Sequence, residues 1–226
     1  MQEQVPGQDA KRAVVVPVPD LEGNLLDQLL AASTALTLKQ QAPDGFEFRQ
    51  RYVVSGANMV LFTEQKGLFV NDILPGPWRR GELRVLDGQG SVWLYVRKQP
   101  ALLASRAVVL DHHSLAMAAV VRESSWPGRD YGLYSAGGDR VGGLSATGRL
   151  PMKFRLCYDG EPVGDLERRW GDIGEGNLAL RQFTLNWKGD LPLDARKAFL
   201  AGALLMIWYY APAPRRRRGP AWRVAD

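Results

Sequence analysis

The chain has 226 residues, of which 46% are hydrophobic and 23% are charged, a composition typical of a globular protein with a full core. Its single cysteine, Cys157, excludes a disulfide within the chain and a zinc site built from cysteines, which favours a reducing compartment. The net charge of +5 is concentrated near the C-terminus, so we do not predict nucleic-acid binding by the folded body. The cations near the C-terminus include four consecutive residues, here called the tail arginines: Arg215, Arg216, Arg217 and Arg218.

The first 19 residues are predicted to be a flexible leader, because prolines interrupt their short apolar run and no secretory signal pattern is present. A short helix is expected within residues 20–34, with Asp20 as its N-cap. Its leucines recur at helical spacing and form one apolar stripe: Leu21, Leu25, Leu26, Leu29 and Leu30.

From Phe46 onward the apolar period changes from that of a helix to that of a strand. In VWLYV, for example, Leu94 and Val96 would face one side of a sheet while Tyr95 faces the other. Turn residues separate such segments and predict β-hairpins around Gly88, Gly138 and Gly160. About ten to twelve short strands result, which favours an antiparallel sandwich or barrel over an α/β fold. The segments are 36–40, 46–54, 59–63, 82–87, 91–97, 106–111, 115–123, 131–135, 141–145, 152–158, 162–170 and 179–187.

An unbroken apolar run covers residues 198–211, between Lys197 and Pro212. As a helix it would be only about 21 Å long, and a bilayer core needs about 20 apolar residues. We therefore predict a buried helix, with a membrane-spanning anchor as the alternative. Large side chains point from every face of this helix, so protein must surround it. They are Phe199, Leu200, Leu204, Leu205, Ile207 and Trp208, and Gly202 between them would let a strand pass close.

A sheet long enough to close, followed by one all-apolar helix, predicts a closed antiparallel β-barrel wrapped around that helix, because closure removes the sheet edges. We predict a single domain over residues 20–211 with its central helix at 194–211. A basic tail without fixed structure is expected over residues 212–226.

The segment QFTLNWKGDLPLDARKAFLAGALLMIWYYA, residues 182–211, resembles the C-terminal segment of the phospholipid scramblases. Residues 163–170 (VGDLERRW) and 83–87 (LRVLD) with Gly90 resemble two further strand motifs of that family, and the order of these pieces along the chain is the same. The resemblance spans roughly residues 21–211. It implies the tubby-like fold of the LURP-one-related superfamily, a twelve-stranded barrel around a C-terminal helix. It also implies lipid or partner binding, and calcium-stimulated lipid scrambling in some members.

Two features of that family are missing from this chain. Asp194 is the one match to the acids of the family's proposed calcium loop, and Arg196 follows two residues later. A hard cation needs six to eight oxygen ligands, so we expect no calcium site there and no other cofactor. The cysteine cluster that those proteins use for acylation is reduced to Cys157.

No catalytic motif is recognised, and we predict that the protein is not an enzyme. His112 and His113 are expected to form a polar turn; in an extended chain they would point to opposite sides, and they lack a third metal ligand. Cys157 is expected to be a buried structural thiol. Three acids are expected on a solvated strand surface: Glu161, Asp165 and Glu167.

Two loop tryptophans stand near arginines: Trp78, followed by Arg79 and Arg80, and Trp126 in SSWPGR. Such pairs favour a membrane interface, where the indole lies at headgroup level and the guanidinium meets phosphate. Together with the tail arginines, they predict peripheral binding to an anionic phospholipid surface.

The expected protein is therefore cytoplasmic, lies at the inner face of the plasma membrane, and has phospholipid scrambling as a further activity to test. Loops folded back onto the barrel and a tail that only adds solubility are the simpler explanations of the same residues. Two alternative functions stay open: an intracellular protein-interaction module without lipid transport, and a protein anchored by a single membrane span.

Overall fold

The computed structural model describes residues 24–41, 51–66, 81–99, 106–123, 130–147, 153–170, 181–188 and 190–210. At residues 169, 170, 181 and 208–210 the backbone alone is described. The leader predicted over residues 1–19 and the tail predicted over residues 212–226 lie outside these ranges.

The first described element is the helix α1, Leu25–Ala32. Its N-cap is Asn24, whose side-chain Oδ1 accepts a hydrogen bond from the backbone N–H of Leu26 at 3.0 Å. The prediction of Asp20 as the N-cap is therefore wrong. The predicted helix had to pass through Gly23, a poor helix former, whereas Asn24 caps a start immediately after it. The buried face of α1 consists of Leu26, Leu29 and Leu30.

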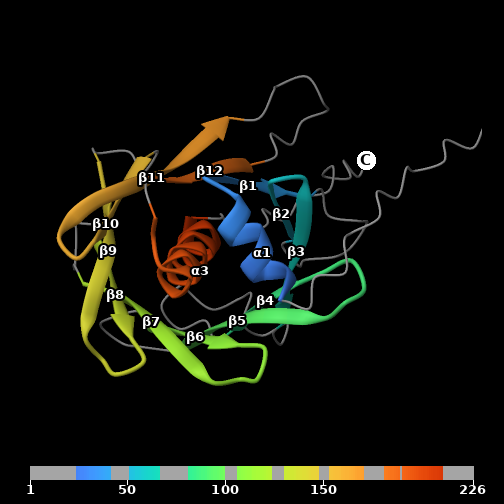
Figure 1. Cartoon of the computed structure of the whole chain (residues 1–226), viewed down its shortest axis with the longest axis horizontal. Coiled ribbons are helices and arrows are strands. Elements are labelled where there is room, and N and C mark those ends of the chain that lie inside the picture. The colour runs from blue at the N-terminus through green and yellow to red at the C-terminus, as the bar shows by residue number, and fades with distance from the viewer. Residues whose placement is uncertain are drawn as a thin grey trace, which may run out of the picture.

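Twelve strands form one closed antiparallel barrel, in which each strand pairs with its neighbours in sequence and β1 closes the ring by pairing with β12 (Figure 1). At the closure Leu38 lies opposite Phe183 of β12 on one side and Val54 of β2 on the other. The number of strands is the upper end of the predicted range. Their bounds are β1 Ala35–Gln40, β2 Tyr52–Gly56, β3 Met59–Lys66, β4 Gly81–Leu86, β5 Val92–Gln99, β6 Arg106–Asp111, β7 Ala116–Arg122, β8 Asp130–Ser135, β9 Arg140–Ala146, β10 Lys153–Tyr158, β11 Glu161–Trp170 and β12 Arg181–Trp187.

The strands alternate between the barrel interior and its outer wall, as their sequences predict. In β12, Phe183, Leu185 and Trp187 are at most 5% exposed, whereas Gln182 and Thr184 next to them are half-buried on the outer side. Apolar side chains at every second position thus supply the core.

Tight turns join five pairs of strands. In the β4–β5 turn, Asp87 accepts hydrogen bonds from the backbone N–H groups of Gln89 and Ser91, both at 2.9 Å. The residue in the left-handed region is Gly90, with φ +88°, rather than Gly88, on which the prediction centred this hairpin. Glycine adopts this conformation without the steric cost that a side chain would add.

The C-terminal helix α3, Leu193–Tyr210, lies inside the ring of strands (Figure 1). Its large side chains are at most 1% exposed: Phe199, Leu200, Leu204, Leu205 and Ile207. The side chain of Trp208 lies outside the described residues. Burial of the five large side chains contributes on the order of 10 kcal/mol before conformational entropy, which is comparable to the net stability of a domain.

At Gly202, α3 lies close against the wall. A Cβ atom at this position would lie 2.9 Å from Cδ1 of Leu144 in β9 and 3.7 Å from Cδ2 of Leu133 in β8. The prediction of a closed, mainly β barrel with a short N-terminal helix and a C-terminal helix packed against its strands is confirmed.

Candidate functional site

The strands reach the two ends of the barrel in different ways. At one end, here called the hairpin end, short turns join β2 to β3, β4 to β5, β6 to β7, β8 to β9 and β10 to β11, and β12 leads to α3. At the other end, here called the loop end, the described strands stop next to residues 42–50, 67–80, 100–105, 124–129, 148–152 and 171–180.

The helix α3 runs from the hairpin end to the loop end. Its first turn contacts α1, which precedes β1 at the hairpin end. Half-way along, Gly202 lies against Leu133 and Leu144, which are central in their strands. The C-terminus of α3 at Tyr210 is therefore at the loop end.

The predicted lipid-binding residues lie outside the described residues, as does Trp126; they are Trp78, Arg79, Arg80, Arg215, Arg216, Arg217 and Arg218. The residues to which these segments are attached are described, and all of them lie at the loop end. Gly81, which follows Arg80, begins β4 there. β7 and β8 flank residues 124–129 at this end, and α3, which precedes the tail arginines, ends there as well.

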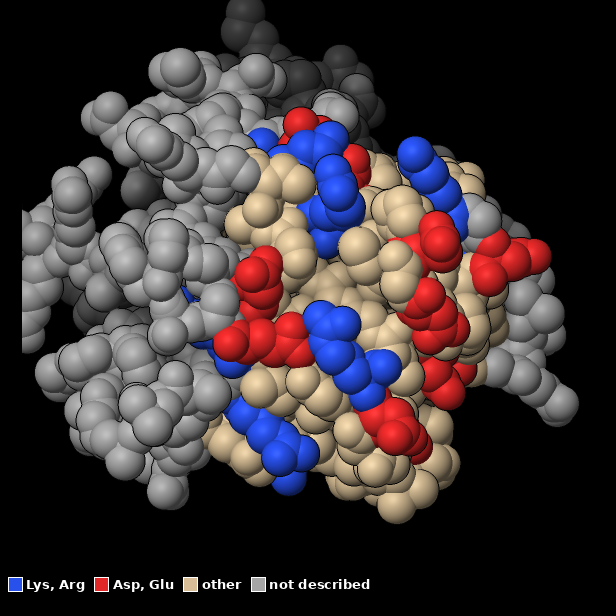
Figure 2. Space-filling view, turned by 90° about the vertical axis from the view of Figure 1, so that its left-hand side faces the viewer, with Lys and Arg blue, Asp and Glu red and all other residues tan. Residues whose placement is uncertain are grey.

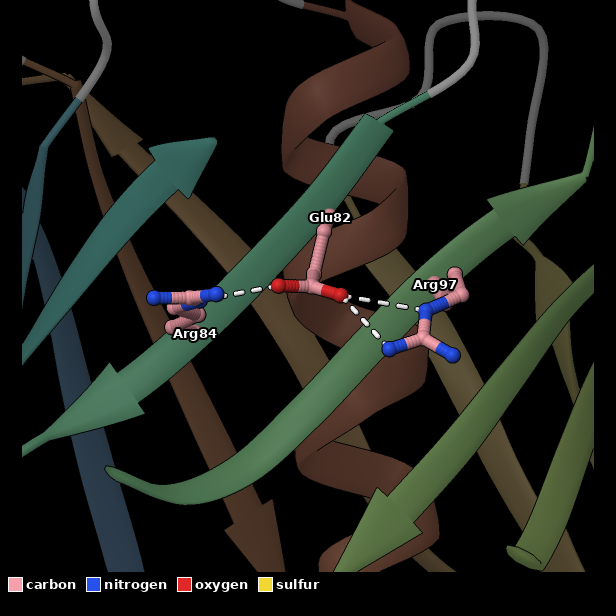
Figure 3. A network of polar contacts seen from close by, with 3 residues as sticks. All are labelled: Glu82, Arg84 and Arg97. Atoms are coloured by element: carbon pink, nitrogen blue, oxygen red, sulfur yellow. Dashed lines mark hydrogen bonds and ion pairs between the residues drawn. The ribbon is translucent and has the colours of Figure 1, made fainter. Parts of the chain in front are cut away.

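A carboxylate held by two guanidinium groups lies on the outer wall near the loop end (Figure 3). Nε of Arg84 donates to Oε1 of Glu82 at 2.8 Å, while Nε and Nη2 of Arg97 both donate to Oε2, at 3.0 and 2.8 Å. The Glu82 side chain is 17% exposed. Partial burial opposes its ionisation, but the hydrogen bonds from Arg84 and Arg97 outweigh this effect and lower the pKa of Glu82.

A shallow groove lies beside this network on the wall of β2, β3 and β4, with a volume of about 350 Å³. The guanidinium of Arg84 lies 5.6 Å above the ring of Tyr95, and Arg84 is opposite Glu64 in the sheet register. The groove is lined by both polar and apolar residues: Gln41, Arg51, Phe62, Thr63, Glu64 and Leu86. This cluster was not identified from the sequence, although Glu82 and Arg84 are two residues apart and so must share the outer face.

A second polar cluster lies on the outer wall of β7, β8 and β9, over a glycine that has no side chain of its own. Arg140 donates from Nε and Nη2 to the two carboxylate oxygens of Glu123, at 2.8 and 2.9 Å, and the Tyr134 hydroxyl donates to Oε1 at 2.8 Å. These side chains lie over Gly132, and only a glycine leaves room for them: a Cβ atom at this position would clash with the Glu123 carboxylate. The hydrogen bonds from Arg140 lower the pKa of Glu123.

Of the three acids predicted on a solvated strand surface, Asp165 has a different environment. It accepts a hydrogen bond from Nδ2 of Asn186 at 2.8 Å and forms an ion pair with Lys153 at 2.9 Å. Partial burial opposes its ionisation, yet these two contacts prevail and lower the pKa of Asp165. It therefore ties β10, β11 and β12 together.

At the hairpin end, a buried arginine joins α1 to the first turn of α3. Nη1 of Arg196 donates to the backbone carbonyl of Leu30 at 2.6 Å, and Nε donates to that of Leu191 at 3.1 Å. The guanidinium lies 5.5 Å from the ring centroid of Trp187. A cation beside the last carbonyls of α1 is favourable for its helix dipole.

The acids near this junction do not fit a calcium site, because they face cations of the chain itself. Oδ1 of Asp27 is 2.7 Å from Nζ of Lys197, and Oδ1 of Asp194 is 4.0 Å from the same nitrogen. Oδ1 of Asp190 lies 3.9 Å from Nη2 of Arg196. Throughout the part of the chain that the structure describes, no three His, Cys, Asp or Glu side chains gather closely enough to hold a metal ion.

The prediction of a polar turn at His112 and His113 is confirmed: both lie in the β6–β7 turn, with ring centroids 3.8 Å apart. One interpretation of a single residue is corrected. Cys157 is half-buried rather than buried, because Leu156 faces the interior and the register with β11 shifts between these two residues.

Comparison with protein-family models, with curated proteins and with solved structures finds no match to this chain. The closed twelve-stranded barrel with a C-terminal helix is consistent with the tubby-like fold that the resemblance implies, but does not identify the family. Among the described helices, none combines the length and the apolar character that crossing a bilayer requires.

Proposed function

We propose that this chain is a scramblase-like barrel that binds anionic phospholipid membranes peripherally through its loop end, at the cytoplasmic face of the plasma membrane. One observation carries the proposal: the predicted lipid-binding segments are all attached at the same end of the barrel. They follow or precede β4, the β7–β8 pair and α3 in the chain. Segments attached at one end can reach one flat surface together.

The residue types in these segments suit that surface. Tryptophan and arginine are favourable at the headgroup level, and each basic side chain near an anionic leaflet contributes about 1 kcal/mol. The tail arginines would supply the largest share of the charge, and Trp78 with Arg79 and Arg80 an aromatic contact.

Lipid scrambling, the movement of phospholipids between the two leaflets, is a separate proposal that goes beyond membrane binding. The described part of α3 fills the barrel interior with side chains that are at most 1% exposed from Phe199 to Ile207, so a headgroup would have to move along the outside of the protein. Vesicles carrying a fluorescent lipid test this activity. If the distribution of that lipid between the leaflets is unchanged by the protein, with and without calcium, the scrambling proposal is wrong.

Vesicle flotation tests the binding itself. We expect vesicles that contain phosphatidylserine to carry the protein upward, and vesicles of phosphatidylcholine alone to leave it behind. Replacement of all four tail arginines by alanine should weaken flotation, whereas replacement of the hairpin-end residue Lys188 by alanine is the matched control and should not. Absence of flotation in every mixture would favour the alternative of a protein-interaction module.

A further inference from the structure

The two ends of the barrel differ in the sign of their exposed charges. At the loop end, basic side chains within two residues of a strand terminus are exposed on five strands, and the exposed acid near them, Glu123, is bound by Arg140. The hairpin end shows the reverse. The exposed loop-end cations, here called the rim, are Lys39, Lys66, Arg97, Arg106, Lys153 and Arg155. The exposed hairpin-end acids are Asp139, Asp159, Glu161, Asp190 and Asp194. Asp190 and Asp194 lie 3.9 and 4.0 Å from the buried Arg196 and Lys197, and the exposed cations at this end are Lys188 and Arg140, of which Arg140 binds Glu123.

Most of the rim charge is not neutralised within the described structure. Arg97 pairs with Glu82, and Lys153 pairs with Asp165. The other four rim residues form no ion pair with a described residue. Figure 2 shows the wall of β8–β10 with both signs interspersed, and acidic side chains gathered toward its right-hand edge, the hairpin end. This side of the barrel therefore lacks the excess of cations found among the exposed charged side chains of the loop end.

The length of the barrel separates the two sets of charges beyond the range of screening. Lys153 and Glu161 lie at opposite ends of the β10–β11 pair, five residues apart along the strand direction, or about 17 Å at about 3.3 Å per residue. The Debye length at physiological salt is about 8 Å. A membrane that touches the rim would thus attract its cations without repelling the hairpin-end acids, whereas a membrane against the side wall would meet both.

We infer that the rim is a docking surface for anionic phospholipid headgroups, and that the barrel stands on the membrane by its loop end with the hairpin end directed away. This inference rests on the proposed function and adds to it lipid-binding residues of the folded wall and an orientation. The partner is a membrane surface whose negative charge is spread over many headgroups, since the rim cations come from five strands rather than from one pocket.

Two matched substitutions test the surface in the full chain. Lys66→Gln removes an exposed rim cation, and Lys188→Gln removes an exposed cation at the hairpin end. With vesicles of phosphatidylcholine and phosphatidylserine at about 0.15 M salt, we expect Lys66→Gln to weaken binding about fivefold and Lys188→Gln to leave it unchanged. The triple variant Lys39→Gln, Lys66→Gln, Arg106→Gln should bind at least about tenfold more weakly, with unaltered far-UV circular dichroism.

Energy transfer to an acceptor lipid tests the orientation. In a Cys157→Ser chain, a donor dye is attached either at Lys153→Cys, at the loop end, or at Glu161→Cys, at the hairpin end. We expect clearly stronger transfer from position 153. Equal transfer, or stronger transfer from position 161, overturns the orientation. Unchanged binding of the triple variant overturns the rim as a docking surface, while failure of the unmodified chain to bind any anionic vesicle overturns the proposed function together with the rim.

Discussion

Replacement of Arg196 by methionine tests whether the buried arginine holds the two helices together. Methionine has a similar length, but it removes the donors to the carbonyls of Leu30 and Leu191 at 2.6 and 3.1 Å and the cation–π contact of the guanidinium with the Trp187 ring. Hydrogen bonds from a charged group contribute about 1.5–3 kcal/mol each to stability. Part of this loss is offset, because the methionine variant no longer has to bury a charge. We expect the free energy of unfolding to fall by about 3 kcal/mol.

Urea denaturation followed by tryptophan fluorescence measures this change, because the free energy of unfolding falls linearly with urea concentration, so a shift of the midpoint at constant slope gives the change in free energy. The control is Lys188→Met, an exposed residue that should change the free energy by less than about 0.5 kcal/mol. If the two variants unfold at the same urea concentration, then Arg196 does not stabilise the junction and the account given for its burial is wrong.

Three further substitutions test the core, the outer wall and the barrel closure. Leu205→Asp places a charge at a fully buried site, so it should cost several kcal/mol of stability and unfold the domain. The control Leu115→Asp, at a site 65% exposed, should leave the domain folded. A soluble Leu205→Asp variant with an unchanged melting temperature would contradict the buried helix. Glu82→Gln should destabilise the protein by about 1 kcal/mol at pH 7; because the folded pKa of Glu82 is lowered, this difference should be fully present above the unfolded pKa and be lost as the pH falls through the folded pKa, and a difference that is unchanged from pH 7 to pH 2 would exclude the ion pairs as its cause. Trp187→Phe removes the hydrogen bond from its Nε1 to the carbonyl of Ser33 at 2.7 Å and should cost about 1–2 kcal/mol in the same urea assay, and an unchanged transition would show that this bond does not stabilise the closure.

The elements of this fold are predictable because their signals are local. Alternation places Leu36 and Leu38 of β1 inside, and the same period places Phe183 and Leu185 of β12 inside, without knowledge of the partner strand. The apolar run of α3 lacks a polar face, so it requires walls on all sides. These two signals together lead to the closed barrel.

The polar contacts of the junction are not predictable in this way, because they join residues far apart in the chain. The sequence places Arg196 and Lys197 before an apolar helix, where charges usually remain in water, yet both are only 8% exposed. The carbonyl that Arg196 binds belongs to Leu30, 166 residues earlier. Alternation could have identified Glu82 with Arg84 and the outward position of Cys157, but it does not indicate which strand supplies Arg97.

The closure of the ring by β1 and β12 determines the order in which this molecule can be completed. Until β12 is synthesised, β1 has no partner on one side, and its free edge can pair with other chains. The helix that fills the interior follows β12, so during synthesis all twelve strands exist before the side chains that fill the ring. Such a topology favours slow folding, since its last contacts close the longest loops, and the edge of β1 stays open to other chains until they form.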